Sequence, residues 1–232
     1  MKRIVSETKP NVAKRPASVS VVETIIGRIK LDIRTGGYAP GQRLIEADVQ
    51  RMTGASRGPV REAMRRLGAE GLLEIHHNKG ARIRQLTRKE VENLYDVREV
   101  IEGLAAHRAA ERADDPKFRK EIDRLETKFA QSFDGSAQSY MDYNARFHEL
   151  IVKSADNAQL VRMVTELQIP IVMLRLYPII NRDFIARAHR EHGEVIKYLL
   201  KGKGALAERT MRSHIRSTKS TVLKKATLLN EG

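Results

Sequence analysis

Three histidines stand where helical spacing would turn them toward a protein interior. His148, His192 and His214 each share a stripe with apolar residues three or four positions apart, in three separate expected helices. Asn144 lies one turn before His148 on the same stripe. One inward histidine is usually a core residue with a satisfied hydrogen bond, but three on helices that must pack together favour a shared site. Imidazole suits zinc, nickel, iron or manganese, and the spacing does not choose among these metals.

A second set of residues that could do chemistry opens a short expected helix. Ser56 can cap this helix, and a helix N-terminus favours an anion. Arg57 and Arg61 are four positions apart and share one face, whereas Val60 and Met64 face the other way. Guanidinium groups suit both phosphate contacts and bidentate recognition of guanine. The alternative is that the two arginines only cover a solvated helix face.

Arg98 is the third candidate, because it falls on an inward stripe with Leu94 and Ile101. An unpaired buried charge is costly, so an inward arginine needs an anionic partner. Two interpretations carry equal weight. Arg98 forms a structural ion pair with Glu102, four residues later, or it binds the carboxylate of a small effector.

Composition and charge limit the classes of partner. The chain has 232 residues, a formal net charge of +14 and a pI of about 10.1. Residues 1–85 hold 17 Lys and Arg against 8 Asp and Glu, so the excess positive charge concentrates there. This favours a polyanionic partner, either nucleic acid or an anionic membrane surface. A basic protein without such a partner is the plain alternative.

The sequence contains no cysteine, which excludes disulfides, a cysteine nucleophile and cysteine-ligated metal sites. This fits a reducing cytosol, and we expect a cytoplasmic protein. We expect no signal peptide, because the basic N-terminus lacks a continuous apolar stretch. We expect no membrane partner, because the densest apolar run, residues 169–180, is interrupted by Arg175 and two prolines.

Hydrophobic periodicity predicts three helices in the first third of the chain. The first begins near Val19 and ends at Gly36-Gly37. The second runs from about Glu46 to Met52. The third begins at Ser56 and tolerates Pro59 in its first turn.

Two short strands, residues 72–75 and 81–84, follow these helices and are joined by a turn at residues 76–80. Three helices followed by a hairpin make a winged helix-turn-helix. We therefore expect a flexible basic tail over residues 1–17 and a DNA-binding domain over residues 18–86.

The rest of the chain is expected to be helical. Thr87 and Glu90 form a capping-box signature, and Asp115-Pro116 is typical of a cap followed by a first helical residue. The predicted fold is mostly α, with an N-terminal winged helix-turn-helix and a C-terminal antiparallel all-helical bundle over residues 87–228.

Several short motifs give the first part of the chain a specific resemblance. They are Pro40-Gly41-Gln42-Arg43-Leu44, Ser56-Arg57-Gly58-Pro59-Val60-Arg61-Glu62-Ala63-Met64, Leu67, Glu70-Gly71-Leu72 and Gly80. With these motifs, residues 25–84 resemble the DNA-binding domain of the GntR family of bacterial regulators. The resemblance implies that Arg57 and Arg61 read bases or phosphates and that the wing tip enters the minor groove.

The DNA-binding residues expected on these grounds are Ser56, Arg57, Gly58, Arg61, Lys79 and Gly80. The sequence departs from the family pattern at two positions. Ala47 stands where some members have an arginine that contacts DNA, and Gln50 stands where a small residue is usual. We therefore expect the binding mode of the family but infer no operator sequence.

The second part of the chain resembles the FadR-like branch of the same family, whose ligand-binding domain is of the helical FCD type. The residues that carry this looser resemblance are Tyr95-Asp96-Val97-Arg98, Glu102, Phe147-His148, Asn157, His192 and Met211-Arg212-Ser213-His214. The resemblance covers about residues 90–225. It implies a homodimer and, as a ligand, a small organic acid, which would be held in part by Arg98.

In many domains of this branch an aspartate or asparagine and three histidines bind a divalent metal. The matching residues here are Asn144, His148, His192 and His214. Aspartate is commoner at the first position, and the neutral carbonyl oxygen of Asn144 should weaken metal binding or leave room for an anionic effector. His107 and His189 are competing candidates.

The sequence therefore predicts a ligand-responsive transcription regulator, acting as a repressor at a double-stranded DNA operator. A metal-dependent enzyme that uses the three histidines is the alternative. It lacks support because the chain has no His-Glu-x-x-His motif, no Gly-rich phosphate loop and no nucleophile elbow. An architectural nucleic-acid protein without a ligand would leave the inward polar cluster unexplained.

Overall fold

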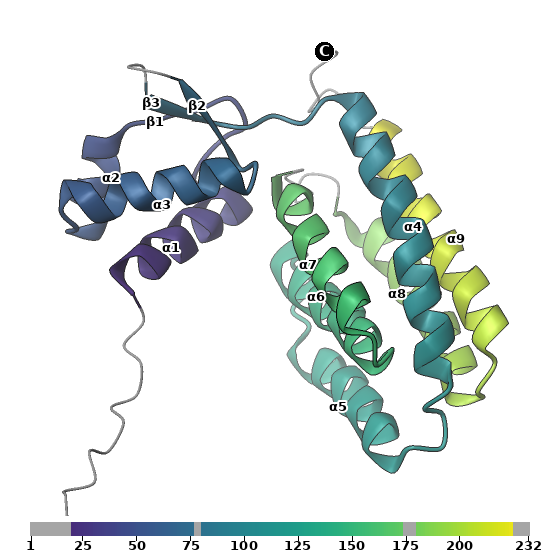
Figure 1. Cartoon of the computed structure of the whole chain (residues 1–232). Coiled ribbons are helices and arrows are strands. Elements are labelled where there is room, and N and C mark those ends of the chain that lie inside the picture. Colours follow the sequence, from purple (N-terminus) through teal and green to yellow (C-terminus); the bar gives the residue numbers. More distant parts are fainter. Residues whose placement is uncertain (1–19, 77–79, 174–179, 225–232) are drawn as a thin grey trace, which may run out of the picture.

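The computed structural model describes residues 20–76, 80–173 and 180–224 (Figure 1). The fold is mostly α, as expected, with helices that account for most of both halves. The elements are α1 (Val21–Thr35), β1 (Arg43–Leu44), α2 (Glu46–Thr53), α3 (Arg57–Ala69), β2 (Leu73–His76), β3 (Gly80–Ile83), α4 (Arg88–Ala110), α5 (Pro116–Ser132), α6 (Ala137–Ser154), α7 (Ala158–Met173), α8 (Arg182–Leu200) and α9 (Gly204–Lys224).

The first three helices begin and end at signals that the sequence carries. α1 starts after Ser20, whose side chain accepts a hydrogen bond from the amide of Val22 at 3.3 Å. It ends at Gly36, which adopts the left-handed conformation with φ of 86°. A residue without a Cβ takes this conformation at little cost. The two expected starting points, Val19 for α1 and Ser56 for α3, are within two residues of those observed.

The wing is a three-stranded antiparallel sheet rather than the expected hairpin. β3 lies in the middle and pairs with β2 on one side and with β1 on the other. The sequence did not predict β1, because a strand of two residues is too short to show alternation. The two predicted strands are each displaced by one residue. The expected turn includes residues 77–79, which lie outside the described residues.

The buried apolar side chains form two clusters. One joins α1, α2, α3 and the sheet, and includes Ile29, Val49 and Leu67. The other joins the helices from α4 to α9. In this second cluster α4 packs along α9 in the opposite direction (Figure 1). Arg88 at the start of α4 donates a hydrogen bond to the carbonyl of Leu223 near the end of α9.

Capping residues expected in the second half are confirmed. Thr87 and Glu90 form the reciprocal capping box at the start of α4. The Asp115 carboxylate accepts hydrogen bonds from the amides of Lys117 and Phe118 at the start of α5. These bonds satisfy amide donors that a helix N-terminus leaves without intrahelical partners.

Candidate nucleic-acid interface and metal centre

The face of α3 that carries Arg57 and Arg61 points away from the protein core. Val60, Met64 and Leu67 are buried against α1 and the sheet. The side chains of Arg57 and Arg61 are 67% and 58% exposed. This division between two faces is the one that a helix lying in a DNA groove requires.

The start of α3 differs from the expectation in one respect. Ser56 occupies the N-cap position, but its side chain makes no capping hydrogen bond. A capping side chain bonds the second or third amide of the helix, and here the third residue is Pro59, which has no N–H. Gly58 is exposed, and a Cβ built there would meet no other atom within 4 Å. The helix start is therefore open to a partner.

The wing borders the same surface. Gly80, the first residue of β3, has φ of 81°, and a Cβ there would approach the Leu44 carbonyl at 3.4 Å. A glycine is needed for this backbone conformation. Lys79, the other expected wing residue, lies outside the described residues.

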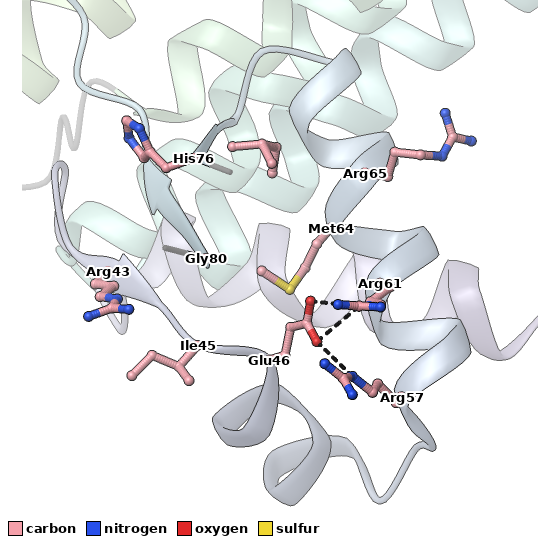
Figure 2. Close-up of a pocket in the computed structure, with 10 residues that line it drawn as sticks. Arg43, Ile45, Glu46, Arg57, Arg61, Met64, Arg65, His76 and Gly80 are labelled. Carbon is pink, nitrogen blue, oxygen red and sulfur yellow. Dashed lines mark hydrogen bonds and ion pairs between the residues drawn. The ribbon is translucent and has the colours of Figure 1, made fainter. Parts of the chain in front are cut away.

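A hollow of about 590 Å³ lies at the surface, bordered by α3, the sheet and the start of α2 (Figure 2). Basic side chains dominate its lining, with Arg43 and His76 contributed by the sheet and Arg57, Arg61 and Arg65 by α3. A concave surface with this charge is suited to a polyanion.

One acidic residue at this surface was not predicted from the sequence. Glu46, the first residue of α2, accepts hydrogen bonds from Arg61 Nε at 3.0 and 3.2 Å and from Arg57 Nε at 3.3 Å (Figure 2). The hydrogen bond from Arg61 is the main reason why the pKa of Glu46 lies below its ordinary value, and Arg57 adds to the effect. Glu46 lies on α2 and the two arginines lie on α3, so the periodicity of a single helix could not have revealed this pairing.

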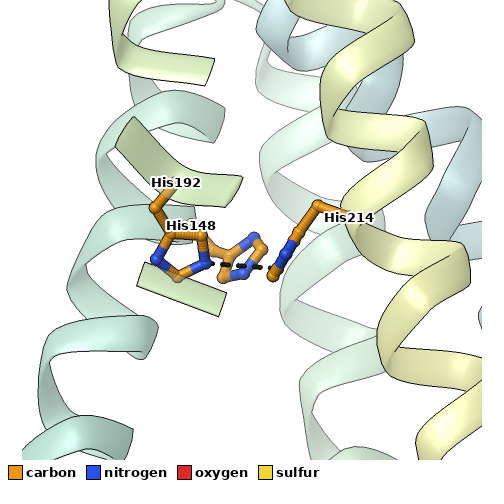
Figure 3. Close-up of side chains that lie close together, drawn as sticks. All are labelled: His148, His192 and His214. Carbon is orange, nitrogen blue, oxygen red and sulfur yellow. Dashed lines mark hydrogen bonds between the residues drawn. The ribbon is translucent and has the colours of Figure 1, made fainter. Parts of the chain in front are cut away.

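The second site lies among the C-terminal helices, where the three inward histidines meet. His148 on α6, His192 on α8 and His214 on α9 are all buried. One nitrogen from each lies within 4.8 Å of the others (Figure 3). The predicted convergence of these histidines is thus confirmed.

The other metal candidates lie in different surroundings. Asn144 is half-buried one turn before His148, and its Oδ1 accepts a hydrogen bond from the Tyr140 hydroxyl at 3.3 Å. His107 contacts Glu208, at 3.0 Å. His189 stacks on a phenylalanine ring and lies 3.6 Å from Glu126. Neither His107 nor His189 belongs to the group formed by His148, His192 and His214.

The chemistry of the cluster fits a divalent metal. Nε2 of His192 lies 3.2 Å from Nε2 of His214. Two imidazole nitrogens bound to one tetrahedral zinc would lie about 3.3 Å apart, given Zn–N distances of about 2.0–2.1 Å. Burial lowers the pKa of His192 well below its ordinary value, and His214 and His148 add to the shift. His192 is therefore neutral at neutral pH, which is the form that binds metals.

Carboxylates hold the far side of two of these rings. Nδ1 of His148 lies 2.5 Å from Glu102 Oε2, and Nδ1 of His214 lies 2.8 Å from Glu191 Oε2. Metal-binding histidines commonly have such a partner on the nitrogen that does not bind the metal. Nδ1 of His192 is buried and has no hydrogen-bond partner among the described residues. Neither Glu102 nor Glu191 was predicted from the sequence to lie at this site.

Arg98 joins the same network through an ion pair. Its Nε donates to Glu102 Oε1 at 2.8 Å, and its guanidinium lies over the ring of Tyr95. Arg98 and Glu102 are both buried. Burial raises the pKa of Glu102, but Arg98 and His148 outweigh this effect and keep the pKa well below its usual range. The structural ion pair, one of the two interpretations of Arg98, is therefore present.

Comparison with known families covers both parts of the chain. Residues 21–83 match the family described as bacterial regulatory proteins of the gntR family. Residues 93–217 match the FCD domain. The chain belongs to the GntR family of bacterial regulators and carries an FCD domain. Like other GntR-family members, it is a DNA-binding transcriptional regulator and not an enzyme.

Several curated proteins are similar to this GntR-family chain over most of its length. A probable D-xylose utilization operon transcriptional repressor from Paenarthrobacter nicotinovorans is 28% identical over 209 residues, which cover 88% of this chain and 89% of that protein. The HTH-type transcriptional repressor RspR of Escherichia coli K12 is 24% identical over 184 residues, which cover 79% of this chain and 81% of RspR.

Solved structures show the same fold. McbR/YncC of Escherichia coli aligns with a TM-score of 0.77 at 18% identity, over 90% of this chain and 99% of that one. A transcriptional regulator described as GntR from Rhodococcus sp. RHA1 aligns with a TM-score of 0.67 at 18% identity, over 88% and 98%. Within the described ranges, no helix is both long and apolar enough to cross a lipid bilayer.

Proposed function

We propose that this GntR-family regulator binds its operator by placing α3 in the major groove. The observation that carries the proposal is the exposure of Arg57 and Arg61 on the face of α3 opposite the buried core. Ser56 and Gly58 bring the start of α3 close to a phosphate. Lys79 and Gly80 form the part of the wing that approaches the minor groove.

We further propose that the chain is a repressor. The D-xylose utilization operon protein and RspR are both described as transcriptional repressors. In this proposal residues 18–86 bind DNA, residues 87–228 sense the ligand, and residues 1–17 are a basic tail.

The sensing site is proposed to hold a divalent metal between His148, His192 and His214, with Asn144 beside them. The burial of the three imidazoles, the lowered pKa values of His192 and His214, and the carboxylates behind His148 and His214 support this assignment. The bound metal would supply a positive centre for a small carboxylate effector. Arg98 and Glu102 form an ion pair at one side of the site. In this proposal the effector carboxylate binds Arg98 by displacing the Glu102 carboxylate.

The regulator is proposed to act as a homodimer through α4. Eight large apolar side chains are exposed among the described residues, and three of them, Val97, Val100 and Leu104, form one stripe on α4. Two antiparallel copies of α4 crossing at Val100 would place Val97 of one copy within about one residue of Leu104 of the other. The exposed Lys89 and Glu111 stand equally far from Val100, so unlike charges would meet at both ends. This complementarity favours a second copy of the chain as the partner.

Selection from a pool of random-sequence DNA duplexes tests the DNA-binding proposal. The parent protein should enrich one family of duplexes. Arg57→Ala and Arg61→Ala should each weaken binding to the enriched duplex by about 1–3 kcal/mol if the side chain contacts a base. Fluorescence anisotropy titrations measure the affinity.

Arg66→Ala is the matched control. Arg66 lies on the same helix but pairs with Glu62 and with Glu23 of α1. We expect its affinity to stay within about 0.5 kcal/mol of the parent value. Affinity of the parent should also fall steeply with rising salt, because phosphate contacts release counterions. Unchanged affinity in both Arg57→Ala and Arg61→Ala would remove the proposed role of α3.

A further inference from the structure

Glu46 lies within a hollow whose other charged side chains are basic. Its carboxylate joins α2 to α3, since it accepts hydrogen bonds from Arg61 and Arg57 (Figure 2). The Glu46 side chain is 30% exposed, so these contacts form at the surface that faces DNA in the proposed function. An acidic residue there repels phosphate and so lowers the affinity for DNA. Its presence at this surface therefore needs a physical reason.

The geometry of the hydrogen bonds supplies one. Both arginines donate to Glu46 through Nε, which leaves the terminal nitrogens of each guanidinium outside these bonds. A guanidinium has five N–H donors in a rigid plane, so a bond at Nε fixes the plane and leaves the opposite edge for another acceptor. One carboxylate therefore sets the orientation of two guanidinium groups.

We propose that Glu46 is a positioning residue that gives α3 its selectivity among DNA sequences. It orients Arg57 and Arg61 for bidentate contacts with base edges. It also offsets one of their two positive charges, which reduces the sequence-independent attraction to phosphate. Selectivity increases through both effects, because binding to the operator is geometric and binding elsewhere is mainly electrostatic. This inference rests on the proposed function of α3.

A simpler role for Glu46 is stabilisation of α2. The first turn of α2 contains two acidic residues, Glu46 and Asp48, and negative charge is favourable at a helix N-terminus. The two roles predict different behaviour for Glu46→Asp. Aspartate keeps the charge at the helix start but is shorter by one methylene, so it cannot reach both arginines from the same backbone position.

The test compares binding to the duplex that the parent enriches from a random pool with binding to a shuffled duplex of equal length and composition. The ratio of the two affinities measures selectivity. Glu46→Gln and Glu46→Asp should each lower this ratio by about tenfold or more. Glu46→Gln should also bind the shuffled duplex at least as tightly as the parent does, because a negative charge is lost. Thermal melts verify that each variant is folded.

Asp48→Asn is the matched control, because it removes a charge from the same helical turn. Asp48 pairs with Arg51 on its own helix, so its removal should leave the selectivity of the parent unchanged within about twofold. The inference is overturned if Glu46→Asp retains the parent ratio, since the negative charge at the start of α2 would then be enough to account for the role of Glu46. It is equally overturned if Glu46→Gln retains that ratio, since selectivity would then not depend on the carboxylate. If the parent enriches no duplex, the proposed function itself fails and this inference with it.

Discussion

His192 and His214 approach each other with their Nε2 atoms 3.2 Å apart, although they belong to different helices. Nδ1 of His214 faces the Glu191 carboxylate and therefore carries a proton. Neutral His214 then has an unprotonated Nε2, and in the metal-free protein His192 Nε2 must be the donor between them. A divalent metal would take the lone pair of His214 Nε2 directly, and that of His192 Nε2 once the His192 proton moves to Nδ1, which is buried and has no hydrogen-bond partner among the described residues.

Metal content depends directly on this arrangement. His148→Ala and His214→Ala should abolish metal retention, because each removes one of three imidazole ligands. The parent, purified without added metal and dialysed, should retain a divalent metal. Inductively coupled plasma mass spectrometry of the parent and variants measures this. His107→Ala is the control, since His107 lies with Glu208 away from the cluster. Equal metal content in the parent and His148→Ala would exclude the site.

Stability of the metal-free protein should fall as the solution becomes more acidic. An unfolded histidine has a pKa of about 6.5. Burial lowers the pKa of folded His192 well below that value and also lowers that of His214. Below about pH 6.5 the unfolded chain therefore binds protons that the folded chain does not, and stability is lost as pH decreases.

Urea denaturation of chelator-treated protein at about pH 7.5 and pH 5.5 measures this loss. His192→Gln should reduce the difference between the two pH values, because it removes one contributing group. His76→Gln changes an exposed histidine on β2 and should keep the difference seen in the parent. An equal pH dependence in His192→Gln and the parent would contradict this account.

The buried pair of Arg98 and Glu102 should be important for folding stability. Glu102→Gln leaves the Arg98 guanidinium buried without an anionic partner. Removing one member of a buried pair costs about 3–5 kcal/mol. Glu194→Gln is the control, since its pairing with Lys197 lies at the exposed surface, where solvent screening leaves an ion pair little effect on stability. Urea denaturation measures the free energy of unfolding of both variants, and a loss for Glu102→Gln as small as that for Glu194→Gln would show that the buried pair is not important for stability.

The proposed dimer should depend on the apolar stripe of α4. Leu104→Glu places a charge at the expected contact and should convert the parent dimer into a monomer. Sedimentation velocity at micromolar concentration measures the mass in solution. Met163→Glu changes an exposed apolar residue on α7 and should leave the dimer intact. A dimeric Leu104→Glu protein, or a monomeric parent, would rule out this interface.

Much of the secondary structure could be predicted because its signals are local. The cap at Asp115, the left-handed Gly36 and the apolar face of α3 each depend on residues within a few positions of one another. The Ser56 cap was predicted only in part, because Pro59 removes one of the amides that the serine could bond. The strand β1 was missed because its two residues gain their pairing from β3, far along the chain.

The sequence by itself determined which residues face inward and which face outward, since helical periodicity fixes the direction of each side chain within its own helix. It therefore placed three histidines toward the core and Arg57 and Arg61 toward solvent. Only the tertiary structure decided which of these side chains meet. The contacts of Glu46 with the two arginines, and of Glu102 with His148, join separate helices. Such contacts depend on how the helices pack, and no local spacing encodes that packing.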